Sequence, residues 1–234
     1  MRTLAIASGK GGVGVTTLTI ALGAALTELG VDTAVVDANI TNPCVGLHLG
    51  TPNVPVALHD TFDDPAKLDN ALYHHVPSGL KVVLGHLSVV HAKRHKHHEL
   101  LKLPQILKRL PCTLAVLDCA TGHHAESLAA LAVVDEALIV TTPELPSVIN
   151  SLKLIARCKE FGTPVKGVII NRAGSHDHEL TADNVQSLLE TPVLAVVPED
   201  PSISEALAIK HPVTYSHPDS PASQAVKQLA SSLL

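Results

Sequence analysis

Short, unbroken apolar runs alternate with stretches of helical spacing along most of this chain. The first run, Leu4–Ala7, leads into a glycine-rich turn and then a helical pattern that extends to about Leu29. Unbroken apolar runs are typical of strands buried on both faces, as in parallel sheets covered by helices. The pattern predicts six further strands, at Thr33–Asp37, Leu80–Leu84, Thr113–Asp118, Ala137–Thr142, Val165–Ile170 and Val193–Val197, the last of them a central strand.

Helices are predicted between these strands. The clearest are a basic segment at Lys96–Leu110, a stretch at Ser147–Phe161 and an amphipathic segment at Pro221–Leu234. Strands that alternate with helices predict an α/β fold: a doubly wound, mostly parallel sheet flanked by helices, with ligands at the carboxyl ends of the strands. No repeat, low-complexity tract or long linker divides residues 1–234, so we expect one domain.

The stretch Ser8–Thr17 joins the first strand to the first helix and has the composition of a phosphate-binding loop. Gly9, Gly14 and Thr16 match the P-loop spacing G-x-x-x-x-G-K-[ST]. Glycines let several backbone N–H groups point inward, and a helix N-terminus adds partial positive charge. Glycines placed for steric reasons alone are the alternative, but four glycines and two threonines in this context favour a phosphate site.

Val15 stands where the lysine of the P-loop belongs. That lysine reaches the terminal phosphates and offsets the charge that grows during phosphoryl transfer, which a valine cannot do. Lys10 lies early in the loop, where it is able to compensate in part. The loop therefore predicts phosphate binding but not catalysis.

Two of the predicted strands end in a carboxylate, at Asp37 and at Asp118. Parallel strands end at one edge of a sheet, so both acids are expected near the loop, where a carboxylate holds Mg²⁺ beside phosphates. Helix capping is the alternative role for Asp118, and the loop in the same sheet favours the metal. Asn39, just after Asp37, is neutral and cannot accept a proton from an attacking water as a carboxylate does.

Composition argues against several classes of protein. A net charge of -5 argues against a general nucleic-acid binder, and 46% apolar with only 2% aromatic residues predicts an aliphatic core. The four cysteines form no C-x-x-C pair, which is typical of inert thiols in a reducing compartment. We see no signal peptide and no apolar run long enough to span a membrane, and we expect a cytoplasmic protein.

Histidines are frequent, with 15 in the chain. His91, His95 and His98 share one face of a continuous helix, a spacing that can hold Zn²⁺ or Ni²⁺. A solvated face is the preferred interpretation, since no cysteine or acid completes a metal site. The basic residues that continue to Arg109 suit contact with DNA, anionic lipid or an acidic partner, but a surface without a dedicated ligand is preferred.

Three motifs follow one another along the chain: Lys10-Gly11-Gly12-Val13-Gly14-x-Thr16-Thr17, then Asp37-Ala38-Asn39-x-x-Asn42-Pro43, then Asp118-Cys119-Ala120-Thr121-Gly122. They resemble the deviant Walker A loop, switch I, and Walker B running into switch II of the MinD/ParA family of P-loop ATPases. Val133–Ser147, the Ile170–Arg172 segment and Val197–Pro201 are also very similar to the archaeal MinD-type proteins. The resemblance covers nearly the full length.

The resemblance implies a P-loop NTPase fold with ATP or ADP and Mg²⁺ as cofactors. It places Lys10 at the signature lysine, which reaches across an ATP-bound dimer to the partner's phosphates, and Asn171 at the residue that recognises adenine. The implied catalytic positions are Lys10, Asp37 and Asn39, and the implied metal positions are Thr16, Asp37 and Asp118. The implied nucleotide contacts are Gly9, Gly11, Gly12, Val13, Gly14, Val15, Thr16, Thr17, Asn171, Arg172, Pro198, Glu199 and Asp200.

The departures from the family pattern lie where hydrolysis takes place. Val15 replaces the P-loop lysine, Asn39 replaces the second acid of D-x-D, and Ala120 stands where switch II usually has proline. Positions that contact nucleotide and metal mostly keep their residue types. Our hypothesis is a MinD-like positioning or regulatory protein that binds adenine nucleotide, dimerises on ATP through its nucleotide face, and hydrolyses ATP weakly or not at all.

Two alternative functions stay open. A maturation or cargo factor for a metal or cluster is disfavoured, because such family members need a cysteine pair at the dimer interface and no cysteine here has a close partner. A scaffold indifferent to nucleotide is the second alternative, opened by Val15. An unidentified protein partner is expected, but specific nucleic acid is not. The segment Pro221–Leu234 lacks basic and bulky aromatic residues, so stable membrane attachment is not expected.

Overall fold

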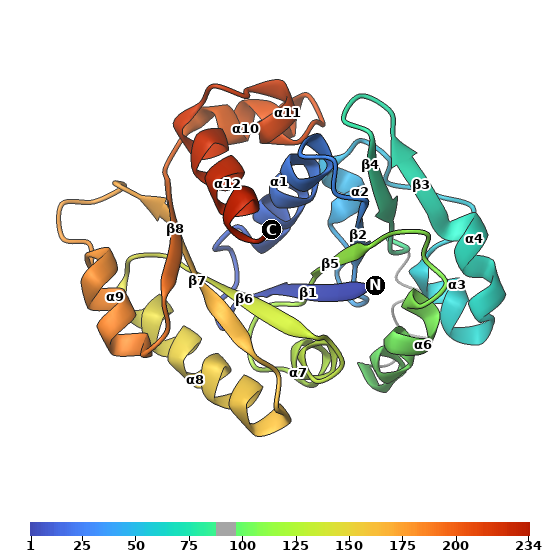
Figure 1. Cartoon of the computed structure of the whole chain (residues 1–234), viewed down its shortest axis with the longest axis horizontal. Coiled ribbons are helices and arrows are strands. Elements are labelled where there is room, and N and C mark those ends of the chain that lie inside the picture. The colour runs from blue at the N-terminus through green and yellow to red at the C-terminus, as the bar shows by residue number, and fades with distance from the viewer. Residues whose placement is uncertain (88–96) are drawn as a thin grey trace.

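A computed structural model describes residues 1–87 and 97–234. Within them, eight strands form one sheet in the order β3-β4-β2-β5-β1-β6-β7-β8 (Figure 1). The strands span Arg2–Ala7 (β1), Thr33–Asp37 (β2), Leu72–His75 (β3), Leu80–Val83 (β4), Leu114–Asp118 (β5), Glu136–Thr141 (β6), Val165–Ala173 (β7) and Val193–Pro198 (β8). Only the β3–β4 pair is antiparallel, so the predicted mostly parallel sheet is confirmed for the described chain.

Helices connect successive strands. In the described residues, the α-helices are Val15–Glu28 (α1), Val45–His48 (α2), Leu58–Asp63 (α3), Leu68–Ala71 (α4), Leu103–Leu107 (α6), Ala125–Leu131 (α7), Leu145–Phe161 (α8), Ala182–Leu189 (α9), Pro201–Ala208 (α10), Val213–Ser216 (α11) and Pro221–Ser232 (α12). The same part of the chain contains two short 3₁₀ helices, Pro65–Lys67 (η1) and His97–Lys102 (η2).

The helices cover both faces of the sheet, as the doubly wound prediction requires (Figure 1). Successive side chains of a strand point to opposite faces. In β1, Leu4 and Ile6 therefore join the apolar cluster under α1 and α12, whereas Ala5 and Ala7 join the cluster under α7, α8 and α9. The predicted closing helix is confirmed as α12, which packs against α1 and β8 with its apolar side buried.

The segment predicted to be helical at Lys96–Leu110 is helical in its described part as far as Leu107, as the 3₁₀ helix η2 followed directly by the short helix α6. Pro104 lies in the first turn of α6, where the missing N–H costs no hydrogen bond but where a helix from upstream cannot continue. Lys96 lies outside the described residues.

Three features of the sheet differ from the sequence pattern. The edge strand β3 was not predicted, because its sequence Leu-Tyr-His-His is only partly buried and carries no apolar run. The predicted strand at Val193–Val197 is β8, and it forms the opposite edge of the sheet rather than a central strand. Finally, β7 runs beyond the predicted end at Ile170 to Ala173, so that Asn171 and Arg172 lie on the strand.

Candidate functional site

The glycine-rich turn between β1 and α1 lies against α8 on one side and β7 on the other. A Cβ at Gly9 would lie 2.4 Å from the carbonyl oxygen of Asn150, on α8. Gly14 has φ of 94°, the left-handed region that favours glycine, and a Cβ there would lie 2.4 Å from Nδ2 of Asn171, on β7. No side chain in the described structure caps α1, so its first-turn N–H groups are available to an anion.

Val15 is the first residue of α1 and is buried. Its side chain is 4% exposed and belongs to the apolar cluster that also contains Val13 and Leu18. Its carbonyl oxygen accepts a hydrogen bond from the hydroxyl of Thr19 at 2.9 Å. The position of the P-loop lysine is therefore filled by a packed aliphatic group that contributes no charge to the loop.

Thr16, Asp37 and Asp118 come together where β2 and β5 end. Asp37 and Asp118 are opposite each other in these neighbouring parallel strands. The Thr16 hydroxyl donates to Oδ2 of Asp118 at 2.8 Å, and the backbone N–H of Val45 donates to Oδ2 of Asp37 at 3.0 Å. The Oδ1 atom of each acid is buried and has no hydrogen-bond partner in the described structure.

Burial perturbs both acids. It raises the pKa of Asp118 to about 7, although hydrogen bonds from Thr16 and Thr19 act in the opposite direction. Burial and the charge of Asp118 raise the pKa of Asp37 well above its ordinary value. Two adjacent carboxyls with unpartnered oxygens are the hard donor set that Mg²⁺ prefers, so these residues fit the implied cation.

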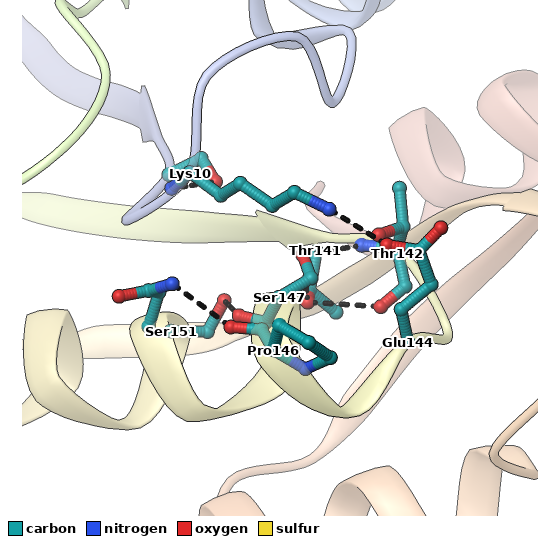
Figure 2. A network of polar contacts seen from close by, with 9 residues as sticks. Lys10, Thr141, Thr142, Glu144, Pro146, Ser147 and Ser151 are labelled. Carbon is teal, nitrogen blue, oxygen red and sulfur yellow. Dashed lines mark hydrogen bonds and ion pairs between the residues drawn. The ribbon is translucent and has the colours of Figure 1, made fainter.

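Lys10 extends toward the N-terminus of α8, as Figure 2 shows. Its Nζ lies 2.6 Å from Oε2 of Glu144, and this ion pair holds the pKa of Glu144 below its ordinary value. The turn that carries Glu144 is itself fixed, because Oγ of Ser147 accepts from the backbone N–H of Thr142 at 3.0 Å. The ammonium group of Lys10 is therefore bound to Glu144 of the same chain and does not point into the phosphate-binding loop.

Asn39 is partly exposed and stabilises the loop after β2. Its Oδ1 accepts a hydrogen bond from the backbone N–H of Asn42 at 3.2 Å. In this contact a short polar side chain accepts a hydrogen bond from the backbone three residues further along and so fixes the local turn. The position expected to help orient an attacking water thus holds an amide that is engaged in local structure.

The nucleotide contacts expected outside the glycine-rich loop separate into two groups. Arg172 and Glu199 form a loose ion pair, 3.8 Å between Nε and Oε2, and both line a cavity of about 600 Å³ together with Lys10. Asn171 is buried beside the loop instead: its Nδ2 donates to the carbonyl oxygen of Val13 at 2.7 Å, and its Oδ1 has no partner in the described structure.

Asp200 supports the fold and does not line this cavity. Its carboxylate accepts hydrogen bonds from the backbone N–H of Ser202 at 2.9 Å and of Ala222 at 3.0 Å, which joins the starts of α10 and α12. Burial acts to raise the pKa of Asp200, but these hydrogen bonds hold it below its ordinary value. Pro198 ends β8 and is likewise absent from the cavity wall.

The cavity is lined in part by residues that the sequence did not single out as contacts. Beside Lys10–Val13, which were expected, Thr142–Glu144, Ser175, His176 and Glu179 line it. Glu179 accepts hydrogen bonds from the backbone N–H groups of Gly174, Ser175 and His176, at 2.7 to 3.0 Å, which lower its pKa. No sequence motif marks this loop, because Glu179 holds it through hydrogen bonds to backbone N–H groups, which do not depend on residue type.

The histidine and cysteine patterns do not form a metal site in the described chain. His91 and His95 lie outside the described residues, so the predicted histidine face is not described as a unit. Among the described residues, no three His, Cys, Asp or Glu side chains form a cluster that could hold a metal ion. Burial raises the pKa of all four cysteines, which fits the predicted inert thiols.

Across residues 1–87 and 97–234, no helix combines the length and the apolar character that crossing a bilayer would require.

The sequence matches a ParA family model, described as NUBPL iron-transfer P-loop NTPase, over residues 1–234. It is similar to an uncharacterized ATP-binding protein of Methanocaldococcus jannaschii, with 36% identity over 233 residues that cover 99% of this chain and 87% of the relative. A second such protein of that organism is 33% identical over 230 residues, covering 97% of this chain and 86% of the relative.

Two archaeal structures have closely similar folds. The septum site-determining protein MinD of Pyrococcus horikoshii, complexed with Mg-ADP, superposes with a TM-score of 0.92 at 31% identity and covers 99% of this chain and 95% of that one. The cell division ATPase MinD of Pyrococcus furiosus gives a TM-score of 0.93 at 30% identity, with coverage of 99% and 98%. The predicted fold is confirmed.

Proposed function

The chain belongs to the MinD/ParA family of P-loop NTPases, and we propose that it binds adenine nucleotide with Mg²⁺ as an ATP-dependent dimer switch with little or no hydrolysis. One observation carries the proposal. The glycine-rich loop leads into the uncapped N-terminus of α1 and lies beside Thr16 and the paired acids Asp37 and Asp118, whose Oδ1 atoms have no partner among the described residues. Such an arrangement provides amides for phosphate and oxygens for a cation.

In this proposal the phosphates bind the backbone of the loop. The contacting residues are Gly9, Gly11, Gly12, Val13, Gly14, Val15, Thr16 and Thr17. Val15 takes part through its backbone N–H only, because its side chain is packed in the core. The MinD of Pyrococcus horikoshii, whose structure was solved with Mg-ADP, supports the assignment of the ligand.

The adenine side is assigned to the ends of β7 and β8. The buried Oδ1 of Asn171 has no partner among the described residues, and it is the kind of acceptor that the adenine amino group requires. Arg172 and Glu199 line the cavity, whereas Pro198 ends β8 and Asp200 accepts a hydrogen bond from the Ser202 backbone at the start of α10. We assign the cavity of about 600 Å³ to the nucleoside, because its volume is that of a small-molecule site.

Thr16, Asp37 and Asp118 are the residues that would hold Mg²⁺, and the cation would supply charge to offset that of the phosphates. Burial raises the pKa of the Asp37 and Asp118 carboxyl groups, so a bound cation would favour their ionised forms, which the fold alone disfavours.

Weak hydrolysis follows from two positions. Val15 removes a positive charge beside the terminal phosphates, and Asn39 has no carboxylate to accept a proton from water. Lys10 is the cation that a second copy of the chain would contribute. It is half-exposed and bonded to Glu144, so its movement toward a partner costs one surface ion pair.

The switch is tested by light scattering of the purified protein with Mg-ADP and with Mg-ATP, beside a continuous assay of phosphate release. We expect a monomer with ADP, a dimer with ATP, and turnover far below that of an active family member. The same oligomeric state with both nucleotides would reject the switch and favour the scaffold. Ordinary turnover would reject the loss of hydrolysis.

A second candidate function is supported by the matching family model, whose description names iron transfer. Buried Cys119 and Cys158, and partly buried Cys44 and Cys112, give this function little support, because a carried cluster needs accessible thiolates. Anaerobic reconstitution with iron and sulfide decides between the two. Stoichiometric cluster binding that Cys44→Ser abolishes would favour the carrier.

A further inference from the structure

The loop after β2 and the helix after β5 are joined by one side chain. Glu126, in the first turn of α7, accepts a hydrogen bond through Oε1 from the backbone N–H of Thr41 at 2.9 Å. Its Oε2 accepts a second hydrogen bond from the hydroxyl of Thr41. Both carboxylate oxygens therefore bind the same residue of a segment far away in the sequence. We call this contact the Thr41–Glu126 clamp.

The clamp connects the two segments that carry the acids of the proposed Mg²⁺ site. Thr41 follows Asp37 at the end of β2, and Glu126 follows Asp118 at the end of β5. The two strands are already neighbours, with Asp37 and Asp118 opposite each other. A hydrogen bond from Ala38 N–H to the Asp118 carbonyl, at 3.0 Å, continues the pairing only one residue past β2. Beyond that point, the clamp ties the loop to α7.

Helix stabilisation alone does not explain the position of the Glu126 carboxylate. An acid in the first turn of a helix interacts favourably with the helix dipole wherever its side chain points. In the described structure no side chain caps α7, and the Glu126 carboxylate turns to Thr41 instead. Hydrogen bonds to an ionised acceptor are stronger than those between neutral groups, so the clamp is a firm contact for a surface loop.

Other contacts of this loop in the described structure hold its shape. Asn39 bonds Asn42 within the loop, and Nε2 of His59, on α3, lies 2.9 Å from the carbonyl oxygen of Ile40. On the other side, the backbone N–H of Gly122 donates to the Ser8 carbonyl at 2.8 Å, which ties the segment before α7 to the phosphate loop. The clamp completes this connection from the phosphate loop to the loop after β2.

We propose that Glu126 is a positioning residue for the divalent cation. The clamp holds the loop 38–44 against α7, so that Asp37 and Asp118 face the cation as a preformed pair. This inference rests on the proposed function. Without the clamp, the loop must be ordered when the cation binds, and the entropy cost lowers cation-dependent nucleotide affinity. Nucleotide binding without the cation depends on the phosphate loop and is left unchanged.

The first experiment measures hydrogen exchange at the Thr41 amide in the nucleotide-free protein. Glu126→Ala removes both acceptors, and we expect exchange at least tenfold faster. Thr41→Ser keeps both bonds and is expected to match the unmodified chain. The matched control is Asp183→Ala, which removes an exposed acid from the first turn of α9 and is expected to leave Thr41 unchanged. Unchanged exchange in Glu126→Ala would overturn the clamp.

The second experiment measures the affinity for fluorescently labelled ADP in excess Mg²⁺ and in EDTA. For Glu126→Ala we expect the gain in affinity due to Mg²⁺ to fall at least fivefold, with the EDTA value unchanged. Thr41→Ser, which keeps both hydrogen bonds, should retain the full gain. Equal losses with and without Mg²⁺, or no loss, would overturn the positioning role. Absence of binding by the unmodified chain would instead reject the proposed function, and the exchange result would still decide whether the clamp exists.

Discussion

Asp37 and Asp118 are opposite each other in neighbouring parallel strands, both are buried, and each has one carboxylate oxygen without a partner in the described structure. Burying a carboxylate without a compensating charge is unfavourable. A fold that keeps two of them side by side, next to the Thr16 hydroxyl and a phosphate-type loop, gives up stability in the absence of a cation. This cost is the strongest structural indication that the site is built for a bound ion.

The Asp118 carboxyl is expected to make stability depend on pH. Its pKa in the fold is about 7, above the ordinary 3.8, so the folded chain binds a proton that the unfolded chain releases. Its contribution therefore falls as pH rises from about 4 to 7. Asp118→Asn should be more stable than the unmodified chain at pH 8, on the order of 1–4 kcal/mol, and the difference should shrink toward pH 5.

Denaturant melts at pH 5 and pH 8 measure this effect. The control is Asp183→Asn, which neutralises an exposed acid on α9 and should show no such trend. A difference between Asp118→Asn and the unmodified chain that stays constant with pH would show that the acid is not held protonated by burial.

Val15→Lys tests what the packed aliphatic group has replaced. Lysine at a buried helix start is expected to lower the free energy of unfolding by about 1–3 kcal/mol without nucleotide. Affinity for Mg-ATP should rise, since a cation is added beside the terminal phosphates. Turnover should rise only when Asn39→Asp is combined with it, by roughly a hundredfold or more, the usual size of one transition-state contact. The measurement is the rate of phosphate release by the two single variants and the double variant. A double variant with no gain in turnover would contradict the proposal that Val15 and Asn39 account for weak hydrolysis.

Lys10→Ala should separate dimer formation from stability. The Lys10–Glu144 ion pair is exposed, with 38% and 44% of the two side chains accessible, so it contributes at most about 1 kcal/mol. Its loss should change Tm by only a few degrees but abolish the ATP-dependent dimer. The control, Arg157→Ala, removes a comparable exposed ion pair with Glu160 on α8. It should leave the ATP-dependent dimer intact and change Tm by no more than a few degrees. Dimer formation by Lys10→Ala would refute the role of Lys10.

Gly14→Ala tests the packing of the phosphate loop against β7. The substitution imposes left-handed strain and brings a methyl group to 2.4 Å from Nδ2 of Asn171. Gly162→Ala is a matched control, because Gly162 also has positive φ, of 76°, but has open space around its Cβ position. The control should lose about 1 kcal/mol and Gly14→Ala about 1–2 kcal/mol more. Urea unfolding measures both variants. Equal losses of unfolding free energy in Gly14→Ala and Gly162→Ala would show that the Asn171 side chain moves aside without destabilising the fold.

The sheet was largely predictable from the sequence, because strands buried on both faces must be apolar throughout. The run Leu114–Asp118 is an example, with every residue buried. The edge strand β3, Leu-Tyr-His-His, is only partly buried and contains no apolar run, so it left no comparable pattern. The order of the strands was also not readable, because apolar runs say nothing of neighbours, and β8 proved to be an edge.

The candidate site was predictable where a motif fixes backbone geometry and less so where a side chain chooses its partner. The loop and the acids Asp37 and Asp118 meet because parallel strands end at one edge. By contrast, Asp200 turns to the starts of α10 and α12, and Glu126 crosses to Thr41. These contacts depend on how distant segments pack, which spacing along the chain does not encode.

The central claim is that the loop still binds a polyphosphate although Val15 stands at the lysine position. Isothermal titration calorimetry of the unmodified chain with Mg-ADP, and with ADP in EDTA, tests this claim most directly. We expect saturable one-to-one binding in both conditions, tighter with Mg²⁺, and loss of the Mg²⁺ gain in Asp118→Asn. No heat of binding at millimolar Mg-ADP, together with no thermal stabilisation, would contradict the claim.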